Sequence, residues 1–285
     1  MYLFLLFRLI ALPMPTRISE IISCLNEHAP FALAESWDNV GLLVGDPTRT
    51  VTSILIGLDP TCTLAKEAIS VGADAIITHH PLIFKPLPAI DTASPSGRFI
   101  EMTVSHRISV IACHTNLDSA DGGVSDILAK AVGLDHVQPL LPCSTSGNRA
   151  HGMGRIGRFT KAKPAAEFLR DIGEAIGLPA FFIAGRLPAA ISTVAVCGGS
   201  GSELASIARE LGADVFITAE IKHNVARWAE EQEFCLIEGT HFGTERHAVT
   251  LLTELLRQES LSRNWGVAVS PTTTEHHPFV LTHID

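Results

Sequence analysis

The chain has 285 residues, of which 46% are hydrophobic and 18% charged, and its formal net charge is −9. A chain of this length and composition can form a substantial core, in one large domain or two lobes. Lys and Arg are scattered along it and form no basic stripe. We therefore expect a globular protein whose primary partner is not nucleic acid, since nucleic-acid binding needs clustered positive charge.

The six cysteines of the chain form no CxxC pair. Cys113, Cys197 and Cys235 lie within or at the ends of apolar segments that resemble strands. Cysteines in such positions act as small buried hydrophobic residues, and disulfides are rare in the cytosol. We expect a reduced, cytoplasmic protein without a disulfide framework.

Residues 1–13 are mostly apolar, but they are too few to span a bilayer as a helix, and Arg8 interrupts them. They also lack the basic n-region and the small-x-small cleavage site of a signal peptide. Met14 follows directly, and residues 15–22 have the pattern of a helix entry. We expect no membrane segment, and we interpret residues 1–13 as a non-native or disordered extension before a true start at Met14. Export is the alternative.

The first half of the chain alternates between strand and helix patterns. Helical periodicity covers residues 18–28 and ends before Pro30. Trp37, in the polar loop that follows, is either a core residue or part of a site. The further expected elements are strand 53–57, helix 63–70, strand 75–77, a Pro-rich loop over 81–97, helix 98–106, strand 108–113 and helix 124–132, which Gly133 closes.

The second half opens with a polar stretch over residues 140–157. Residues Gly152 to Gly157 match the pattern GxGxxG. No strand is expected before this pattern, and the segment that overlaps its end, residues 155–160, is expected to be a strand and not a helix. This context excludes a dinucleotide-binding fingerprint, which needs a strand before it and a helix after it. The elements expected next are a helix over 163–177, strands 180–184 and 193–197, a helix over 222–230 and strand 234–237.

The chain contains an internal similarity at a constant offset of 140, between residues 53–80 and 193–220. Eight positions are identical, among them the Gly-Ala-Asp before the second strand of each segment. We expect an α/β fold of two related lobes with mixed sheets, whose strand ends meet at one cleft. The expected division assigns residues 14–130 plus 236–285 to the first lobe and 131–235 to the second.

Three polar clusters follow expected strands, which is where open α/β sheets bind ligands. They are His79-His80, the segment from His114 to Asp118, and the segment from His241 to Glu245. Alone, the histidine pair is most simply a pair of surface or capping residues. Together, histidines and carboxylates without thiolates suit Zn²⁺, Fe, Mn²⁺ or Ni²⁺. The set fits two open metal sites in which one carboxylate bridges two ions.

Four motifs resemble those of the Nif-three-like family, whose members are described as GTP cyclohydrolase I type 2 or dinuclear metal-binding proteins. The motifs are Trp37–Gly45 (WDNVGLLVG), Thr78–Phe84 (THHPLIF), His114–Asp118 (HTNLD) and Gly239–Arg246 (GTHFGTER). The resemblance runs over almost the whole chain from Met14 and corresponds to the short form of the family, without an inserted domain. It also implies a toroidal homohexamer.

The resemblance implies two divalent metal ions per subunit, and it implies their ligands. These are His79, His80, Asp118, His241 and Glu245. Glu245 would bridge the ions, with His80 and Asp118 on one and His79 and His241 on the other. The second copy of the repeat has Ala219-Glu220 where the first has the histidine pair. Each chain is therefore expected to carry one composite site.

Two adjacent divalent ions favour hydrolysis, because they activate water and polarise the bond to be cleaved. By resemblance, the expected reaction is that of a GTP cyclohydrolase, in which water opens the purine five-membered ring with release of formate. The alternatives are a dinuclear phosphoesterase or nucleotide hydrolase of other specificity, and a non-enzymatic metal-binding scaffold.

Several further residues are candidates for roles around the ions. His114, Asn116 and Ser200 are candidate substrate contacts, and His114 or Glu35 could transfer protons. The Gly-rich turn over residues 197–203 either holds a phosphate or is a plain turn between strand and helix. The acidic balance of the chain does not favour a triphosphate. The second histidine pair, His276-His277, is interpreted as structural or solvated.

Overall fold

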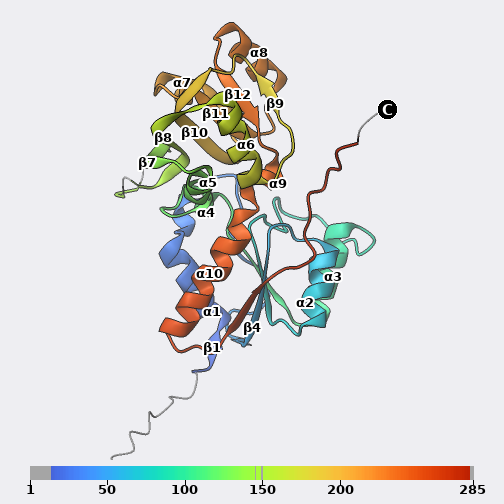
Figure 1. Ribbon diagram of the computed structural model, residues 1–285. Coiled ribbons are helices and arrows are strands. Elements are labelled where there is room, and N and C mark those ends of the chain that lie inside the picture. The colour runs from blue at the N-terminus through green and yellow to red at the C-terminus, as the bar shows by residue number, and fades with distance from the viewer. Residues whose placement is uncertain (1–13, 145, 149, 283–285) are drawn as a thin grey trace, which may run out of the picture.

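The computed structural model describes residues 14–144, 146–148 and 150–282. The expected extension over residues 1–13 therefore lies outside the described residues. Two mixed sheets lie one above the other in the view of Figure 1, and the long helix α10 runs from the junction of the two parts along the lower one. A small antiparallel ribbon of β1 (Thr16–Arg17) and β3 (Thr50–Val51) completes the strands of the lower part.

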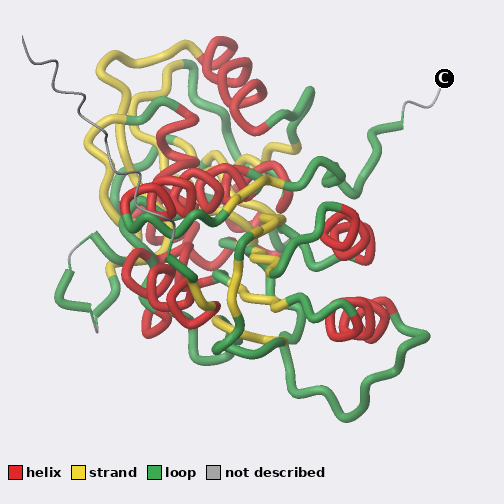
Figure 2. Tube along the Cα trace, turned by 90° about the horizontal axis from the view of Figure 1, so that it is seen from below, coloured by secondary structure: helices red, strands yellow, loops and turns green. Residues whose placement is uncertain are grey.

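The lower sheet has the strand order β13-β4-β5-β6-β2, in which only β2 is antiparallel to its neighbour. Helices cover both of its faces (Figure 2). Its strands are β2 (Gly41–Val44), β4 (Ser53–Gly57), β5 (Ala75–Thr78), β6 (Ser109–Ala112) and β13 (Ala268–Pro271). Its helices are α1 (Ile18–His28) and α10 (His247–Ser262) on one face, and α2 (Cys62–Ser70) and α3 (Pro95–Ser105) on the other.

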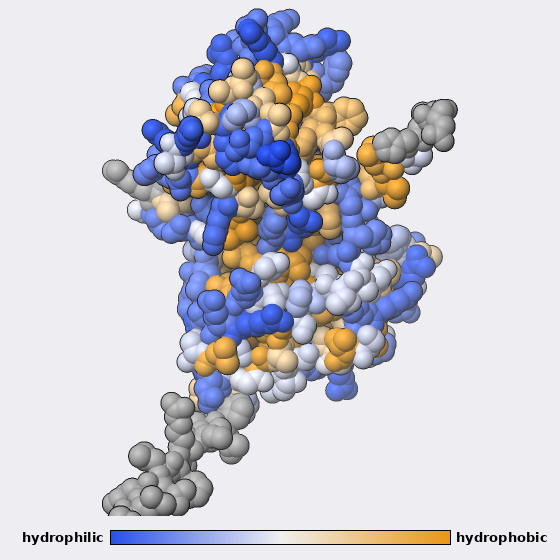
Figure 3. Space-filling view, in the orientation of Figure 1, coloured by the Kyte–Doolittle hydropathy of each residue, from blue (hydrophilic) through white to orange (hydrophobic). Residues whose placement is uncertain are grey.

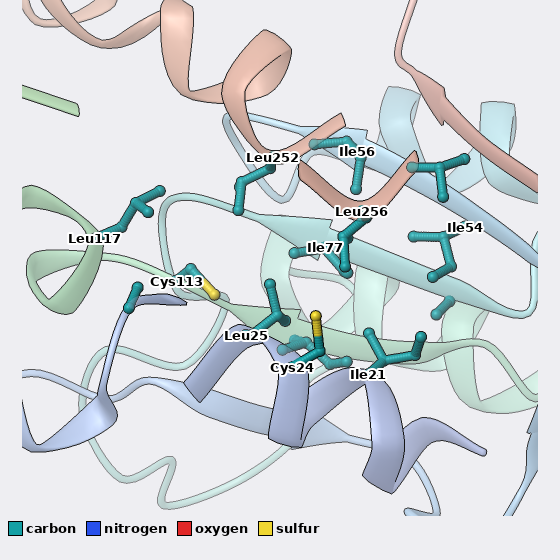
Figure 4. Packing of buried hydrophobic residues seen from close by; sticks show 14 of the residues in the cluster. Ile21, Cys24, Leu25, Ile54, Ile56, Ile77, Cys113, Leu117, Leu252 and Leu256 are labelled. Carbon is teal, nitrogen blue, oxygen red and sulfur yellow. The ribbon is translucent and has the colours of Figure 1, made fainter. Parts of the chain in front are cut away.

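Alternation along the strands explains this three-layer arrangement. Ile54 and Ile56 of β4 pack with α1 and α10, whereas Leu55 between them packs with α2 and α3. Successive side chains of a strand point to opposite faces, so an unbroken apolar run supplies two cores at once. Figure 4 shows the first of these cores, with Leu25 and Leu252 from the two helices directed toward the strand residues.

The upper sheet has the order β7-β8-β10-β11-β12-β9. Its strands are β7 (Asp135–Pro142), β8 (Gly152–Pro164), β9 (Phe182–Ala184), β10 (Ala190–Ser200), β11 (Val215–Ala219) and β12 (Cys235–Glu238). One face packs on α5 (Val124–Val132) and α6 (Ala165–Ile176), and the other on α7 (Ala205–Glu210) and α8 (His223–Glu231). The outer surface over α8 is hydrophilic (Figure 3). Among the described residues, no helix has the length and apolar character needed to cross a membrane.

Four short helical turns complete the described elements. They are η1 (Phe31–Leu33), α4 (Thr115–Ser119), η2 (Ser202–Leu204) and α9 (His241–Glu245). The first of these follows Pro30, which ends α1 as expected. α4 and α9 each begin within three residues of a strand end, so they carry side chains to the carboxyl edges of both sheets.

The two segments related by the offset of 140 pair their strands in the same register. Ile54 lies opposite Ala75 where β4 meets β5, and Val194 lies opposite Val215 where β10 meets β11. Both pairs are parallel. The helices that connect the strands, α2 and α7, also cover equivalent faces of the two sheets. Leu55 of β4 packs with α2, and Ala195, the residue of β10 that corresponds to Leu55, packs with α7.

In each of the two related segments, an aspartate accepts hydrogen bonds from the backbone at the beginning of the first strand. A carboxylate oxygen of Asp74 accepts hydrogen bonds from the backbone amides of residues 52 and 53, at 2.7 and 3.2 Å. The corresponding oxygen of Asp214 accepts from the amides of residues 192 and 193, at 2.8 and 2.9 Å. Residues that correspond in sequence therefore make corresponding contacts.

Some expected elements differ from those observed. The polar stretch over 140–157 contains the turn of a hairpin and the adjoining ends of its two strands, because β7 and β8 pair there and β8 continues to Pro164. The GxGxxG letters lie inside β8, which agrees with their exclusion as a dinucleotide-binding turn. Helix α3 begins at Pro95, since Ser94 accepts a hydrogen bond from Gly97 and Pro fits the first helical position. The division expected between residues 235 and 236 falls inside β12.

Candidate metal centre

The carboxyl ends of strands from both sheets place the candidate ligands. His79 and His80 follow β5, and Asp118 lies in α4 after β6. His241 and Glu245 lie in α9 after β12, one helical turn apart on one face, as their spacing predicts. Thr240 begins α9 and accepts a hydrogen bond from the amide of Gly243. The five residues therefore meet in space although they lie in three distant segments.

The inner group of the cluster consists of His79, Asp118 and Glu245, all of them buried. The Nε2 atom of His79 lies 3.6 Å from Asp118 Oδ1 and 3.7 Å from Glu245 Oε1, too far for a hydrogen bond. Its Nδ1 is 2.8 Å from the carbonyl oxygen of Cys113, which can only accept. This fixes the proton on Nδ1 and directs the Nε2 lone pair toward the carboxylates.

The outer group consists of His80, His241 and Glu245. Glu245 Oε2 lies 2.9 and 3.0 Å from the Nε2 atoms of the two histidines, and those two atoms are 3.2 Å apart. The Nδ1 atom of His80 contacts Asp59 at 2.7 Å, and that of His241 contacts Glu220 at 3.0 Å. With both Nδ1 protons donated to carboxylates, two Nε2 lone pairs and a carboxylate oxygen face one point.

The polar atoms of the cluster fit metal ions better than they fit one another. Among the described residues, His79 Nε2, Asp118 Oδ1 and Glu245 Oε2 are buried without a hydrogen-bond partner. Glu245 Oε2 is close to two imidazoles, but neither contact has hydrogen-bond geometry. A buried polar atom without a partner is costly, and such atoms call for a missing ion or water. Imidazole nitrogens and carboxylate oxygens are ligands of divalent transition metals.

The grouping of the ligands differs from the expected one. His79 lies with Asp118 and His80 lies with His241, the reverse of the partition implied by the resemblance, while Glu245 belongs to both groups. The reason lies in the hydrogen-bond partner of each histidine. His79 is turned inward by the Cys113 carbonyl, whereas Asp59 holds His80 toward α9.

Burial and the neighbouring charges change the acid–base properties of the cluster. Burial, which the imidazole of His79 only partly opposes, raises the pKa of Asp118 to about 7. Burial also acts against the charged form of His80, but the carboxylates of Asp59 and Glu245 outweigh it and raise that pKa to about 10. Despite its burial, the imidazoles of His241 and His79 hold the pKa of Glu245 well below its usual range. The surroundings of Glu245 therefore favour its charged form.

A cavity of about 560 Å³ opens onto this cluster. Segments that follow strands of both sheets line it, including His80, Asp118, His241 and Glu245. Trp37 lines it with 54% of its surface exposed, so Trp37 is part of the cavity wall and not a core residue.

The candidate substrate contacts separate into two kinds. His114 and Ser200 line the cavity, as does Glu35. Asn116 does not: it is fully buried, its amide donates to the carbonyl of Ala29 at 2.7 Å and its oxygen accepts from the amide of His114 at 2.9 Å. Asn116 therefore shapes the loop, and its assignment as a substrate contact is not supported.

The Gly-rich turn over residues 197–203 serves close packing. The amide of Gly199 donates to Thr244 and that of Gly201 donates to Thr218, each at 3.0 Å, so neither is available to a phosphate. A Cβ atom on Gly199 would lie 2.2 Å from Glu245 Oε1, and its φ of +61° also favours glycine. These contacts favour the interpretation of this segment as a plain turn between strand and helix. Gly199 in this turn leaves room for the Glu245 side chain.

Three carboxylates that orient histidines were not among the candidates from sequence. Asp59 and Glu220 hold His80 and His241, and the buried Asp38 holds His114 Nδ1 at 2.9 Å. Sequence signals existed for two of them: Glu220 occupies the position of His80 in the second copy, and Asp38 lies in the motif Trp37–Gly45. The second histidine pair has a structural contact as expected: His277 Nε2 lies 3.0 Å from the Thr240 hydroxyl that begins α9.

The fold and the cluster define an α/β protein with two mixed sheets and buried histidine and carboxylate groups that could hold metal. The chain belongs to the Duf34/NIF3 (NGG1p interacting factor 3) family, whose model matches residues 16–278. This confirms the resemblance that the four motifs indicated.

Relatives and solved structures agree with this assignment. The chain is 34% identical over 266 residues to a Streptomyces coelicolor protein named GTP cyclohydrolase 1 type 2 homolog, covering 92% of this chain and 93% of that one. A Clostridium perfringens protein of the same name is 31% identical over 242 residues, which are 85% of this chain and 92% of its own. A Staphylococcus aureus hypothetical protein of known crystal structure has a TM-score of 0.88 at 30% identity, covering 94% of this chain and 100% of that chain.

Proposed function

We propose that the cluster binds two divalent metal ions and that the protein is a metal-dependent hydrolase. The observation that carries this proposal is the set of buried, unpartnered atoms on His79, Asp118 and Glu245. His79 and Asp118 would hold one ion, His80 and His241 the other, and Glu245 would contribute one oxygen to each. When bound, such a pair of ions supplies an activated water and an electrophile for the bond to be cleaved.

The chain's own residues supply positioning and proton transfer. Asp59 and Glu220 fix the two outer imidazoles so that each presents Nε2 to the shared carboxylate. His114, held by Asp38, lines the cavity with its ring centre 5.4 Å from that of His80. It lies outside the ligand set, and it is the histidine proposed to move a proton to or from a substrate. Trp37 and Phe84 line the cavity beside it, each with its ring centre 6.2 Å from that of His114.

The reaction proposed first is the hydrolytic opening of a heteroaromatic ring with release of formate. It rests on the names of the Streptomyces and Clostridium relatives, each a homolog of GTP cyclohydrolase 1 type 2. A dinuclear phosphoesterase is the second candidate, since the same ligand set serves both chemistries. A toroidal homohexamer and a cytoplasmic location remain proposals. Sedimentation of a species six times the chain mass of 30.5 kDa would support the first of these.

The two βαβ units are proposed to be copies of one ancestral unit that face each other across the site. The conserved register of Ile54–Ala75 and Val194–Val215 supports this, as do the equivalent hydrogen bonds of Asp74 and Asp214. In this proposal the first copy contributes the histidine pair, and the second contributes Glu220 at the position of His80.

The test combines metal analysis with a turnover assay. The purified protein is reconstituted with Zn²⁺, Mn²⁺ or Fe²⁺, and formate release from GTP is followed. Glu245→Ala should lose both metal equivalents and turnover, and Glu254→Ala, at an exposed position of α10, is the matched control. Two equivalents with formate support the proposal. Two equivalents without formate retain the site and exclude GTP as the substrate. Fewer than one equivalent in the wild type overturns the metal site itself.

A further inference from the structure

The wall of the cavity away from the ligand cluster has an unusual charge distribution. Within the described part of the chain, none of the residues that line the cavity is Lys or Arg. Two exposed carboxylates, Glu35 and Glu203, line it instead. Any positive charge in the cavity therefore comes from the histidine and metal cluster, and the rest of the wall is neutral or negative.

The same wall carries large apolar side chains that are left open. Trp37 and Phe84 are 54% and 44% exposed, and their ring centres lie 5.5 Å apart. The ring of His114 stands edge-on to both, at 6.2 Å from each. Leu141 and Met153 line the cavity from the upper sheet. Exposed aromatic rings beside apolar groups in a concave site are suited to stacking on a planar ligand.

We propose that this wall is a binding subsite for a planar, uncharged or cationic aromatic ring system that bears amino groups, and that the substrate carries no phosphate chain. Trp37 and Phe84 stack on the ring. The carboxylates of Glu35 and Glu203 accept hydrogen bonds from its amino groups, since an ionised carboxylate can only accept. This inference rests on the proposed function, because it assumes that the bond to be cleaved lies at the ligand cluster.

The position of the cluster decides against a nucleoside triphosphate. If the ring of such a substrate is opened at the cluster, its phosphates extend along the remaining wall, where no Lys or Arg neutralises them. They would meet Glu35 and Glu203, and like charges in a partly enclosed cavity repel strongly. A phosphate-free nucleoside with the same ring avoids this repulsion and retains the stacking.

The test is the equilibrium binding of guanosine and of GTP to the metal-reconstituted full-length protein, measured by titration calorimetry. We expect guanosine to bind at least about tenfold more tightly than GTP. Phe84→Ala should weaken guanosine binding about tenfold, within the range for loss of one stacking partner. Phe182→Ala, at a position 86% exposed and outside the cavity, is the matched control and should change nothing. Replacing both Glu35 and Glu203 by Gln should reduce the difference in affinity between guanosine and GTP, because the repulsion of the phosphates is removed.

The outcomes separate this inference from the proposed function. Binding of GTP as tight as or tighter than that of guanosine overturns the subsite, and so does a failure to detect guanosine binding. If the protein binds fewer than one metal equivalent, the hydrolase proposal fails, and the same titrations on the metal-free protein still decide whether the wall prefers guanosine. Guanosine binding that Phe84→Ala leaves unchanged also overturns the subsite, because the aromatic wall would then make no contact.

Discussion

Arg155 is the largest fully buried side chain of the protein's described part, and its replacement should be costly. Its Nε and Nη2 atoms donate to the two carboxylate oxygens of Asp126, at 2.7 and 2.6 Å. Nη1 donates to the carbonyls of Gly152 and Gly154, and Nη2 also donates to that of Ala120. One guanidinium thus joins β8 to α5 and to the loop that follows Asp118.

The expected loss in the free energy of unfolding follows from the groups that Arg155→Met deprives of a partner. Breaking a buried ion pair costs about 3–5 kcal/mol, because the remaining charge is buried without a partner. The Asp126 side chain is 23% exposed, so water will solvate part of it. Four carbonyls lose a donor, those of residues 120, 150, 152 and 154, and each adds about 1–3 kcal/mol where water does not replace the donor. We expect a net loss of at least about 3 kcal/mol in the free energy of unfolding.

The assay is urea unfolding followed by tryptophan fluorescence, in which an unchanged slope with urea shows that the loss is in stability. The matched control is Arg186→Met. Arg186 lies 3.3 Å from Glu233, but both side chains are more than 70% exposed, at 74% and 72%. Such a surface pair contributes about 0–1 kcal/mol. A loss of less than about 1 kcal/mol in Arg155→Met, or a loss equal to that of the control, would refute the reasoning.

Three further predictions concern the cluster and the C-terminal segment. Glu220→Gln removes the carboxylate that orients His241 and should weaken metal affinity about 10–100-fold in a chelator competition, whereas an unchanged affinity would exclude this positioning role. Gly199→Ala places a methyl group against Glu245 and should lower metal content, and full occupancy in metal analysis would contradict this. Hydrogen bonds from the three threonines at 272–274 lower the pKa of Glu67 against the effect of burial. The lowered pKa means that the stabilisation from this contact is fully present above the ordinary value of 4.5 and is lost at lower pH. The protection of the amides of residues 272–274 against hydrogen exchange, relative to the intrinsic rate at each pH, should therefore fall below about pH 4.5 in the wild type but not in Glu67→Gln.

Elements with strong local signals could be predicted from the sequence. Helix 124–132 and its closure by Gly133 are observed as predicted, with a φ of +86° at that glycine. The spacing of His241 and Glu245 correctly indicated a helical turn, although the turn is only five residues long. These features depend on residues within one or two turns of each other, which is the range that a sequence pattern describes.

Features that depend on tertiary contacts could not be predicted in this way. Strand β7 contains Pro139 and Pro142, which argue against a strand, yet β7 is the edge of its sheet, where proline is tolerated. The partition of the ligands depends on the side-chain direction of His79, which the distant carbonyl of Cys113 sets. Asp59 has no motif of its own, and only the folded chain brings it to His80.

The placement of Glu245 in both ligand groups has a consequence for synthesis of the protein. His79, His80 and Asp118 leave the ribosome well before residue 245, and Glu245 belongs to both groups of the cluster. Neither group can therefore form on a nascent chain until α9 has been made and packed against β10. In the proposed function, metal loading would therefore follow the packing of α9, and a chain that ended before residue 241 would carry only three of the five donors.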